Sequence, residues 1–198
     1  MKELFVYDRT FYDNGLSCIA GLDEAGRGPL AGPVVASAVV LGADLYIEGV
    51  NDSKKLSEGK RRELFWELVC CAKDIGVGIV DSVEIDRINI LNATKAAMKA
   101  AILDLSSTPD ILLIDAVKLQ DLDIAQHSII RGDSKSAAIA AASIVAKVLR
   151  DSIMLSYHQQ YPQYGFNKHK GYGTKHHIEM ILAHGPCAIH RRSFAPLR

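Results

Sequence analysis

The sequence predicts an α/β fold in which a mixed sheet is flanked by helices. Short apolar runs alternate along the chain with longer segments whose apolar residues recur at helical spacing. One run, ILLI at 111–114, is apolar throughout, which indicates a strand buried on both faces in the middle of a covered sheet. No internal repeat, low-complexity tract or long linker divides the chain.

Each expected element has its own local signal. Runs rich in Val and Ile and bounded by Gly, Pro or polar residues predict strands at 19–22, 33–41, 75–80, 111–114 and 127–130. Helical spacing predicts helices at 58–73, a small and a longer one within 82–105, and others at 134–158 and about 174–184. Ser57 is the expected N-cap of the first helix. Alanines in the first half of 134–158 predict close approach of that helix to the sheet.

The composition is that of a soluble globular domain. A chain of 198 residues, with 48% hydrophobic and 23% charged residues, is long enough for a full core. No apolar run approaches the roughly 20 residues of a membrane helix, and the start lacks a signal-peptide pattern. The four cysteines have no CxxC spacing, so we expect reduced core thiols. These observations predict a monomeric cytoplasmic protein with no membrane partner.

The net charge of zero hides an asymmetry along the chain. Residues 151–198 contain six Lys and Arg but only two Asp and Glu, whereas residues 1–150 contain 17 basic and 21 acidic residues. Six of the seven histidines also lie after residue 150. An acidic body with a basic tail suits a carboxylate-lined centre beside a polyanion-binding surface. We therefore expect a catalytic domain at 1–160 and a basic substrate-binding segment at 161–198.

Acidic residues follow three of the apolar runs or strand–helix junctions: Asp23 with Glu24, Asp115 and Asp133. A carboxylate at such a place is costly to bury unless a cation or a donor compensates it. If the junctions converge, their oxygen ligands select hard ions, Mg²⁺ or Mn²⁺, over zinc. Such a centre fits two-metal phosphodiester hydrolysis.

Two geometric expectations follow. Neighbouring strand residues point to opposite faces, so Asp23 and Glu24 share a site only if the chain bends between them, which the following glycines would allow. Asp151 lies 18 residues beyond Asp133 on the expected helix, about 27 Å away at 1.5 Å per residue. We therefore expect Asp151 to make an ion pair or a packing contact and not to share a metal with Asp133.

Several long stretches resemble the ribonuclease HII family, in the family's order and approximate spacing. They are GLDEAGRGPLAGPVV at 21–35, NDSKKLS at 51–57, LLIDA at 112–116, GDSKSAAIAAASIVAKVLRD at 132–151 and HKGYGTKHH at 169–177. The resemblance implies a ribonuclease H-like mixed sheet flanked by helices, with a small C-terminal helical segment. It implies endonucleolytic cleavage of RNA in RNA–DNA hybrids and on the 5′ side of single ribonucleotides in duplex DNA, leaving 3′-hydroxyl and 5′-phosphate ends.

The resemblance also assigns residues position by position. It implies that Asp23, Glu24, Asp115 and Asp133 bind the metal ions. It implies that Gly26, Arg27 and Gly28 read the ribose 2′-hydroxyl, the group that distinguishes RNA from DNA locally, and that Tyr172 packs on the neighbouring sugar. Lys54, Ser134 and Lys135 match polar positions of the family that lie near the backbone of the bound nucleic acid. Phosphate contact is the natural role of such residues.

Other interpretations stay open at this point. A second two-metal nuclease of this fold, such as ribonuclease HIII or a junction resolvase, would share the carboxylates, and a non-catalytic nucleic-acid-binding module would share the fold. A fourth acid that is Asp133, and the short segment before the first strand, favour type HII over type HIII. His169, His176 and His177 invite a zinc hypothesis, but no paired cysteines or acid stand at ligand spacing.

Overall fold

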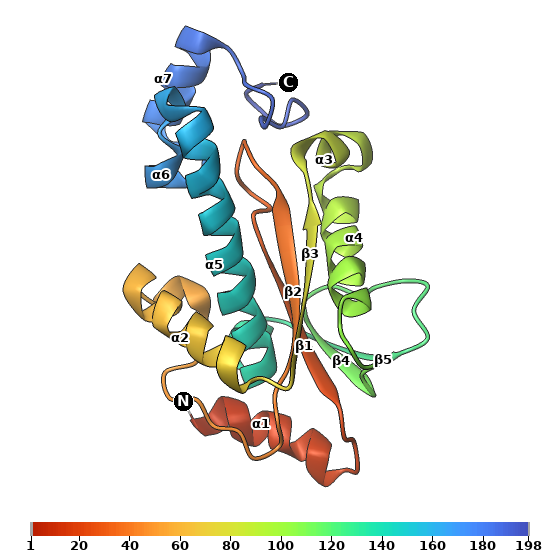
Figure 1. Ribbon diagram of the computed structural model, residues 1–198. Coiled ribbons are helices and arrows are strands. Elements are labelled where there is room, and N and C mark those ends of the chain that lie inside the picture. Colours follow the sequence, from red (N-terminus) through yellow and green to blue (C-terminus); the bar gives the residue numbers. More distant parts are fainter. Residues whose placement is uncertain (1, 198) are drawn as a thin grey trace.

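The computed structural model describes residues 2–197 and contains one five-stranded sheet (Figure 1). Its strands are β1 (Ile19–Ala25), β2 (Val34–Val40), β3 (Asp74–Val80), β4 (Ile111–Asp115) and β5 (Ala125–Ile129), in the order β3-β2-β1-β4-β5. The pairs β3–β2 and β2–β1 are antiparallel, whereas β1–β4 and β4–β5 are parallel. The predicted mixed sheet is therefore confirmed, with apolar β4 between two neighbours.

Helices cover both faces of this sheet (Figure 1). They are α1 (Lys2–Asp13), α2 (Glu58–Cys71), α3 (Ser82–Ile88), α4 (Ile90–Leu103), α5 (Ala137–Gln160), α6 (Phe166–His169) and α7 (Lys175–His184). One core cluster joins α3 and α4 to one face, and a second joins α2 and α5 to the other. The C-terminal helices α6 and α7 lie at the far end of α5, where a third cluster holds them.

The alanine-rich half of α5 lies directly on the sheet, as its composition predicts. Residues 137–142 are five alanines and one isoleucine, and all are buried. A Cβ atom at Gly21 of β1 would overlap the backbone of Ala138, so the strand needs a glycine where the helix crosses it. Ser37 of β2 adds a hydrogen bond, donating from its hydroxyl to the Ala142 carbonyl at 2.7 Å. These contacts fix the height of α5 above β1.

The structure corrects the expected end of β1. Pairing with β2 continues through Ala25, with Asp23 opposite Ser37 and Glu24 opposite Ala36. Both acids therefore lie inside the strand, and the bend expected between them does not occur. The reason is that paired backbone groups in β2 hold these residues extended, so the turn starts only at Gly26, whose φ is +104°.

The start of α5 also differs from the expected one. Gly132–Ser134 form a separate 3₁₀ helix, and α5 begins at Ala137 after Ser136, whose hydroxyl accepts a hydrogen bond from the Ile139 amide. Asp133 therefore precedes α5 instead of lying on it. Ser57 caps α2 as predicted, accepting from the Lys60 amide at 3.2 Å.

The amphipathic helix α1 has no counterpart among the predicted elements. It lies across the start of α5, where the Asp8 carboxylate accepts a hydrogen bond from the Ala138 amide at 2.8 Å. An acid at a helix N-terminus satisfies a free amide and suits the helix dipole. Burial raises the pKa of Asp8 to about 6. Helix α1 is thus attached to the body through a buried polar contact as well as through Leu4.

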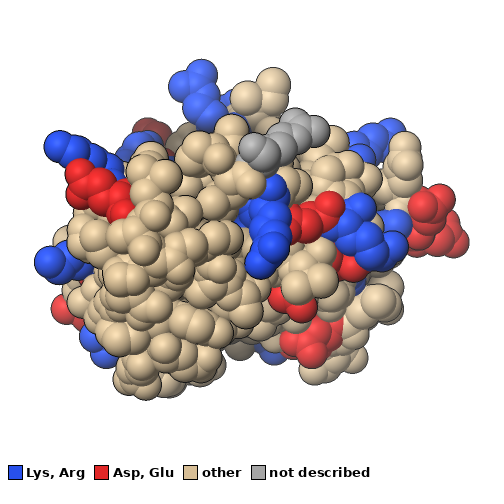
Figure 2. Space-filling model, turned by 90° about the horizontal axis from the view of Figure 1, so that it is seen from above, with Lys and Arg blue, Asp and Glu red and all other residues tan. Residues whose placement is uncertain are grey.

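One expectation from composition needs correction in the described part of the chain. The four cysteines are free, but Cys70 and Cys71 are exposed and Cys18 and Cys187 only partly buried, so they are not core thiols. Seen from the end that carries α7, Lys and Arg side chains are scattered around a broad uncharged area (Figure 2). One basic residue of the tail, Arg191, is fully buried and adds nothing to the surface. No helix within residues 2–197 has the length and apolar character to cross a membrane.

Candidate functional site

Three carboxylates that are far apart in the sequence meet at one end of the sheet. Asp23 lies in β1, Asp115 is the last residue of β4, and Asp133 lies in the 3₁₀ helix before α5. One oxygen from each lies within 4.8 Å of the others, and among residues 2–197 this is the one group of three or more potential ligands with that spacing. The parallel pairing of β1 with β4 and the approach of α5 to β1 create this convergence.

Burial and mutual repulsion make the carboxylates of Asp23 and Asp133 costly to ionise. Burial raises the pKa of Asp23 well above its usual range, and the carboxylates of Glu24 and Asp115 raise it further. The pKa of Asp133 is raised by burial and by the carboxylate of Asp52. Neutralising such a group requires protons or a cation, and a divalent cation does so at neutral pH.

Glu24 lies beside this group without belonging to it. Successive strand residues leave from opposite faces, which explains why its carboxylate is not one of the three. Burial raises its pKa, although the guanidinium of Arg27, 3.3 Å from its Oε1, acts in the opposite direction. Its other oxygen, Oε2, is buried and has no hydrogen-bond partner among the described residues. A buried carboxylate oxygen without a donor fits a cation ligand.

Lys54 carries a positive charge to the edge of the acidic group. Its ammonium lies 3.9 Å from Asp133 Oδ2, and its side chain is otherwise exposed. Partial burial lowers the pKa of Lys54, but the nearby carboxylates of Asp23 and Asp133 outweigh this effect and leave it raised. Its loop is attached to α5 by a 2.6 Å hydrogen bond between the hydroxyls of Ser53 and Ser143. Sequence reasoning missed this serine pair.

A cleft of about 330 Å³ lies between Glu24, which follows Asp23 in β1, and Tyr172 of the C-terminal segment. It is lined by Glu24, Ala25, Gly26, Arg27, Gly28, Ser53, Lys54, Ser143, Lys147, Arg150 and Tyr172. Tyr172 is 45% exposed, and a Cβ atom at Gly28 would lie 3.6 Å from its Cε1 atom. The ring therefore lies against the Gly26–Gly28 loop, although the two are more than 140 residues apart in the sequence. The structure thus places five of the predicted site residues in one cleft with Glu24.

Arg150 is a cleft residue that the sequence analysis did not identify. Its buried guanidinium donates to the carbonyls of Pro33 at 3.0 Å, Lys170 at 3.0 Å and Ala31 at 3.2 Å. Burial lowers its pKa. The four-residue spacing of Ala146, Arg150 and Met154 places this arginine on the core side of an apolar helix. That spacing is the sequence signal by which its buried role could have been predicted.

Ser134 and Lys135 lie near the acids but do not line the cleft. The Ser134 hydroxyl donates to the Arg131 carbonyl at 2.9 Å, within its own turn. Lys135 is exposed, and its amide donates to the Gly132 carbonyl at 2.9 Å. Their substrate contacts stay predictions.

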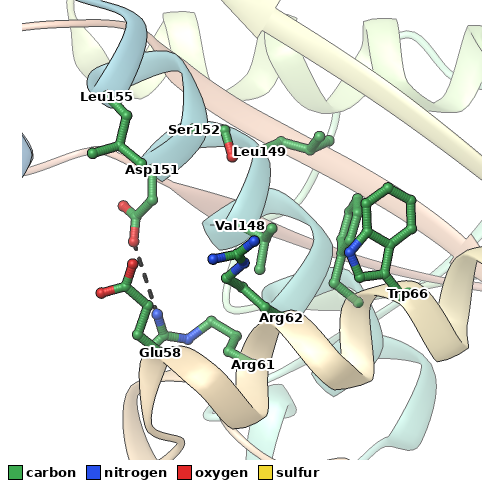
Figure 3. A pocket seen from close by; sticks show the side chains of 10 residues that line it. Glu58, Arg61, Arg62, Trp66, Val148, Leu149, Asp151, Ser152 and Leu155 are labelled. Atoms are coloured by element: carbon green, nitrogen blue, oxygen red, sulfur yellow. Dashed lines mark ion pairs between the residues drawn. The ribbon is translucent and has the colours of Figure 1, made fainter. Parts of the chain in front are cut away.

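Asp151 makes the ion pairs that its spacing predicts. Lys147 lies 2.6 Å from its Oδ1. Arg61 of α2 lies 3.8 Å from its Oδ2 (Figure 3). Asp151 and Arg61 line a hollow of about 380 Å³ between α2 and α5, on whose rim Trp66 is exposed (Figure 3). The three converging acids do not line this hollow. Asp151 therefore joins two helices and does not extend the acidic group.

The set of oxygen donors suits a hard divalent cation. Three carboxylates lie within ligand distance of one another, and Glu24 beside them has an unpartnered oxygen. Such oxygen ligands bind a hard ion well and offer nothing to a soft one. His169, His176 and His177 do not form a comparable group within residues 2–197. An acidic centre beside a cleft with Lys54 and Lys147 suits the handling of a phosphodiester.

Comparisons with known proteins agree with this arrangement. The family model described as Ribonuclease HII matches residues 20–197. The ribonuclease HII of Acetivibrio thermocellus is 57% identical over 192 residues, which cover 97% of this chain and 75% of that protein.

Solved structures share the fold. The ribonuclease H2 from Pyrococcus horikoshii has a TM-score of 0.76 and 30% identity, covering 91% of this chain and 95% of that one. The Bst-RNase HIII complex with Mn²⁺ has a TM-score of 0.72 over 94% of this chain and 70% of that one, and its 20% identity shows the fold alone. The chain therefore belongs to the ribonuclease HII family and is an endonuclease of the ribonuclease H type.

Proposed function

We propose that the protein hydrolyses the RNA strand of RNA–DNA hybrids and cuts on the 5′ side of single ribonucleotides in duplex DNA, leaving 3′-hydroxyl and 5′-phosphate ends. The observation that carries this proposal is the meeting of Asp23, Asp115 and Asp133 beside a cleft in which Tyr172 lies against Gly28. The acids supply the means of cleavage, and the cleft supplies a surface that distinguishes sugars.

In this proposal Asp23, Glu24, Asp115 and Asp133 hold two divalent cations, Mg²⁺ or Mn²⁺. Such ions, when bound, activate the attacking water and stabilise the leaving oxygen. The chain itself keeps the ligands in place: Gly132 donates its amide to Asp115 Oδ1 at 2.9 Å, and Glu24 donates its own to Asp23 Oδ1 at 2.8 Å. Arg27 restrains one oxygen of Glu24.

Recognition of the ribonucleotide falls to the Gly26–Arg27–Gly28 loop and Tyr172. Glycines let backbone donors and acceptors approach a 2′-hydroxyl, the group that separates RNA from DNA. A flat ring against the next sugar disfavours an additional hydroxyl there, so Tyr172 favours deoxyribose at that position. Tyr172 is 45% exposed, so part of its surface is available for this contact.

Lys54, Ser134 and Lys135 contact phosphates in this proposal, and the segment 161–198 forms the second wall of the substrate site on a catalytic domain of residues 1–160. Phosphate contacts fix register and orientation without reading sequence. We further propose that the protein works as a monomer in the cytoplasm, where its substrates are RNA–DNA hybrids and DNA with embedded ribonucleotides.

The test is a 5′-end-labelled duplex that carries one ribonucleotide, incubated with Mg²⁺, with Mn²⁺ and with a chelator. We expect one cut on the 5′ side of the ribonucleotide in the presence of either metal and none in its absence. The all-DNA duplex of the same sequence is the control substrate and stays intact.

Other products would overturn the proposal. A cut on the 3′ side contradicts the proposed cleavage position, and cleavage in chelator contradicts the two-metal mechanism. Cleavage of a ribonucleotide-free four-way junction identifies a resolvase, and tight binding without cleavage identifies a binding module.

A further inference from the structure

Two consecutive residues, His190 and Arg191, are buried behind the cleft and contact both of its walls. Arg191 is fully buried and His190 is 3% exposed, which is unusual for a guanidinium and for an imidazole. Neither residue lines the cleft itself. Their hydrogen bonds, however, end on the backbone of the residues that the proposed function assigns to sugar recognition.

Arg191 binds the loop wall of the cleft. Its Nη2 donates to the Gly26 carbonyl at 2.6 Å and its Nη1 to the Arg27 carbonyl at 3.1 Å. Its Nε donates to the Gly32 carbonyl at 2.9 Å, farther along the same loop. A guanidinium is a rigid planar fork, so three carbonyls bound to it are held in fixed relative positions.

His190 binds the tyrosine wall through a second histidine. The Cys187 amide donates to His190 Nδ1 at 2.9 Å, so in the neutral ring the proton resides on Nε2. His190 Nε2 lies 3.0 Å from His177 Nε2, which must then accept. The proton of His177 therefore lies on Nδ1, which donates to the Tyr172 carbonyl at 2.9 Å. With these two tautomers, each of the three hydrogen bonds from Cys187 through His190 and His177 to Tyr172 has one donor and one acceptor.

Backbone contacts join the same segments. Arg191 donates its amide to the Leu30 carbonyl at 2.8 Å, and Leu30 donates its own to the Gly171 carbonyl at 2.8 Å. His190 also forms an isolated antiparallel bridge with Ala31. The dipeptide thus lies between the loop after β1 and the segment that carries Tyr172, and it contacts both.

We propose that His190 and Arg191, with His177 as the link, are positioning residues that set the separation between the Gly26–Gly28 loop and the Tyr172 ring. The inference rests on the proposed function, in which these two walls recognise the ribonucleotide and the sugar that follows it. A ring displaced from Gly28 no longer disfavours a hydroxyl on the second sugar. Loss of the histidine link therefore weakens the preference for a ribonucleotide–deoxyribonucleotide junction and has less effect on a continuous RNA strand.

The experiment compares two amide replacements of His177. Asn places its amide nitrogen near the position of Nδ1 and keeps the donor to Tyr172, whereas Gln places its amide near Nε2 and keeps only the contact with His190. We measure kcat and KM on a duplex with one embedded ribonucleotide and on an RNA–DNA hybrid, and take the ratio of the two kcat/KM values. Folded protein isolated by gel filtration is used throughout.

We expect the ratio to fall about tenfold in His177→Gln, equivalent to about 1.4 kcal/mol, and to stay within about twofold of wild type in His177→Asn. Arg191→Lys, which keeps the charge but not the fork, should lower the same ratio. His176→Asn, at an exposed neighbouring position, is the matched control and leaves both rates unchanged.

A merely structural role would lower both rates together and leave the ratio unchanged, and this result would overturn the inference. Equal ratios for His177→Gln and His177→Asn would do the same. Tyr172→Ala separates the two proposals: if it lowers the ratio while His177→Gln does not, the proposed function stands and the positioning role fails. If wild type does not cut the ribonucleotide-containing duplex, the proposed function itself has failed.

Discussion

Asp115 combines a structural and a chemical role in one side chain. Its Oδ1 accepts the Gly132 amide and so joins the end of β4 to the turn that carries Asp133. An asparagine keeps this acceptor but loses the charge. We expect Asp115→Asn to fold normally and to cleave roughly 10³-fold more slowly, because a lost metal ligand removes several kcal/mol of transition-state stabilisation. Single-turnover rates measure the loss of cleavage, and the anisotropy of a labelled hybrid shows that the folded variant still binds its substrate. A fully active variant would contradict the catalytic role.

We expect the carboxylate of Asp23 to destabilise the metal-free folded protein, although it serves as a metal ligand in the proposed function. Its raised pKa means that the folded state holds a proton more tightly than the unfolded state, so its contribution to stability falls as the pH rises above about 3.8. At pH 8 without metal the folded protein contains a buried, poorly compensated charge. Asp23→Asn should therefore unfold in chelator with a free energy roughly 1–2 kcal/mol higher than wild type.

The same variant should lose most of the stabilisation that Mg²⁺ or Mn²⁺ gives to wild type, because that stabilisation depends on binding to the folded state. Thermal and urea unfolding with and without metal measure both effects. A variant less stable than wild type in chelator would show that Asp23 stabilises the fold.

At the scale of elements, the contact of α5 with β1 depends on one glycine. A Cβ atom at Gly21 would overlap the Ala138 backbone, which cannot move as a side chain can. We expect Gly21→Ala to lower the free energy of unfolding by about 1–3 kcal/mol or more through overpacking. Gly59→Ala is the control, since it lies exposed in α2 with no atom within 4 Å and should stabilise the protein by roughly 0.5–1 kcal/mol. Urea titration compares them, and equal effects would contradict the close contact.

The sequence predicted most elements because their signals are local. Helical spacing predicted α2, α4 and α7 within a few residues, and the apolar run of β4 predicted an interior strand. The ends of β1 and α5 were wrong for the opposite reason. Pairing with β2 extends β1 through its acids, and Ser136 starts α5 after a separate turn, neither of which a residue pattern reveals.

At the scale of the whole molecule, buried neutral histidines attach the C-terminal segment to the body. Burial lowers the pKa values of His177 and His190 to about 4, below the value of about 6.5 for a free ring. Their contribution to stability is therefore complete above pH 6.5 and is lost as the pH falls toward 4. Each ring, taken alone, lowers the free energy of unfolding by about 2 kcal/mol when the pH falls from 7 to 5.

His177→Asn should reduce this loss of stability between pH 7 and pH 5 by about 2 kcal/mol, because the amide does not titrate. Urea unfolding of wild type and variant at the two pH values measures the difference. The exposed His176→Asn serves as the control and should follow wild type. A variant as pH-sensitive as wild type would show that His177 is not held neutral.

The sequence by itself determined the mixed α/β fold and the family, and it pointed to four acids and one loop as candidate site residues, because these depend on short runs and motifs that stand in the chain as written. Only the tertiary structure decided which oxygens meet: three aspartates at ligand distance, with Glu24 beside them. It also decided that Tyr172 lies against Gly28 and that Arg150, His190 and Arg191 hold the walls of the cleft. The physical reason is that such contacts depend on strand pairing and on the height of α5 above the sheet, which join residues more than 90 positions apart.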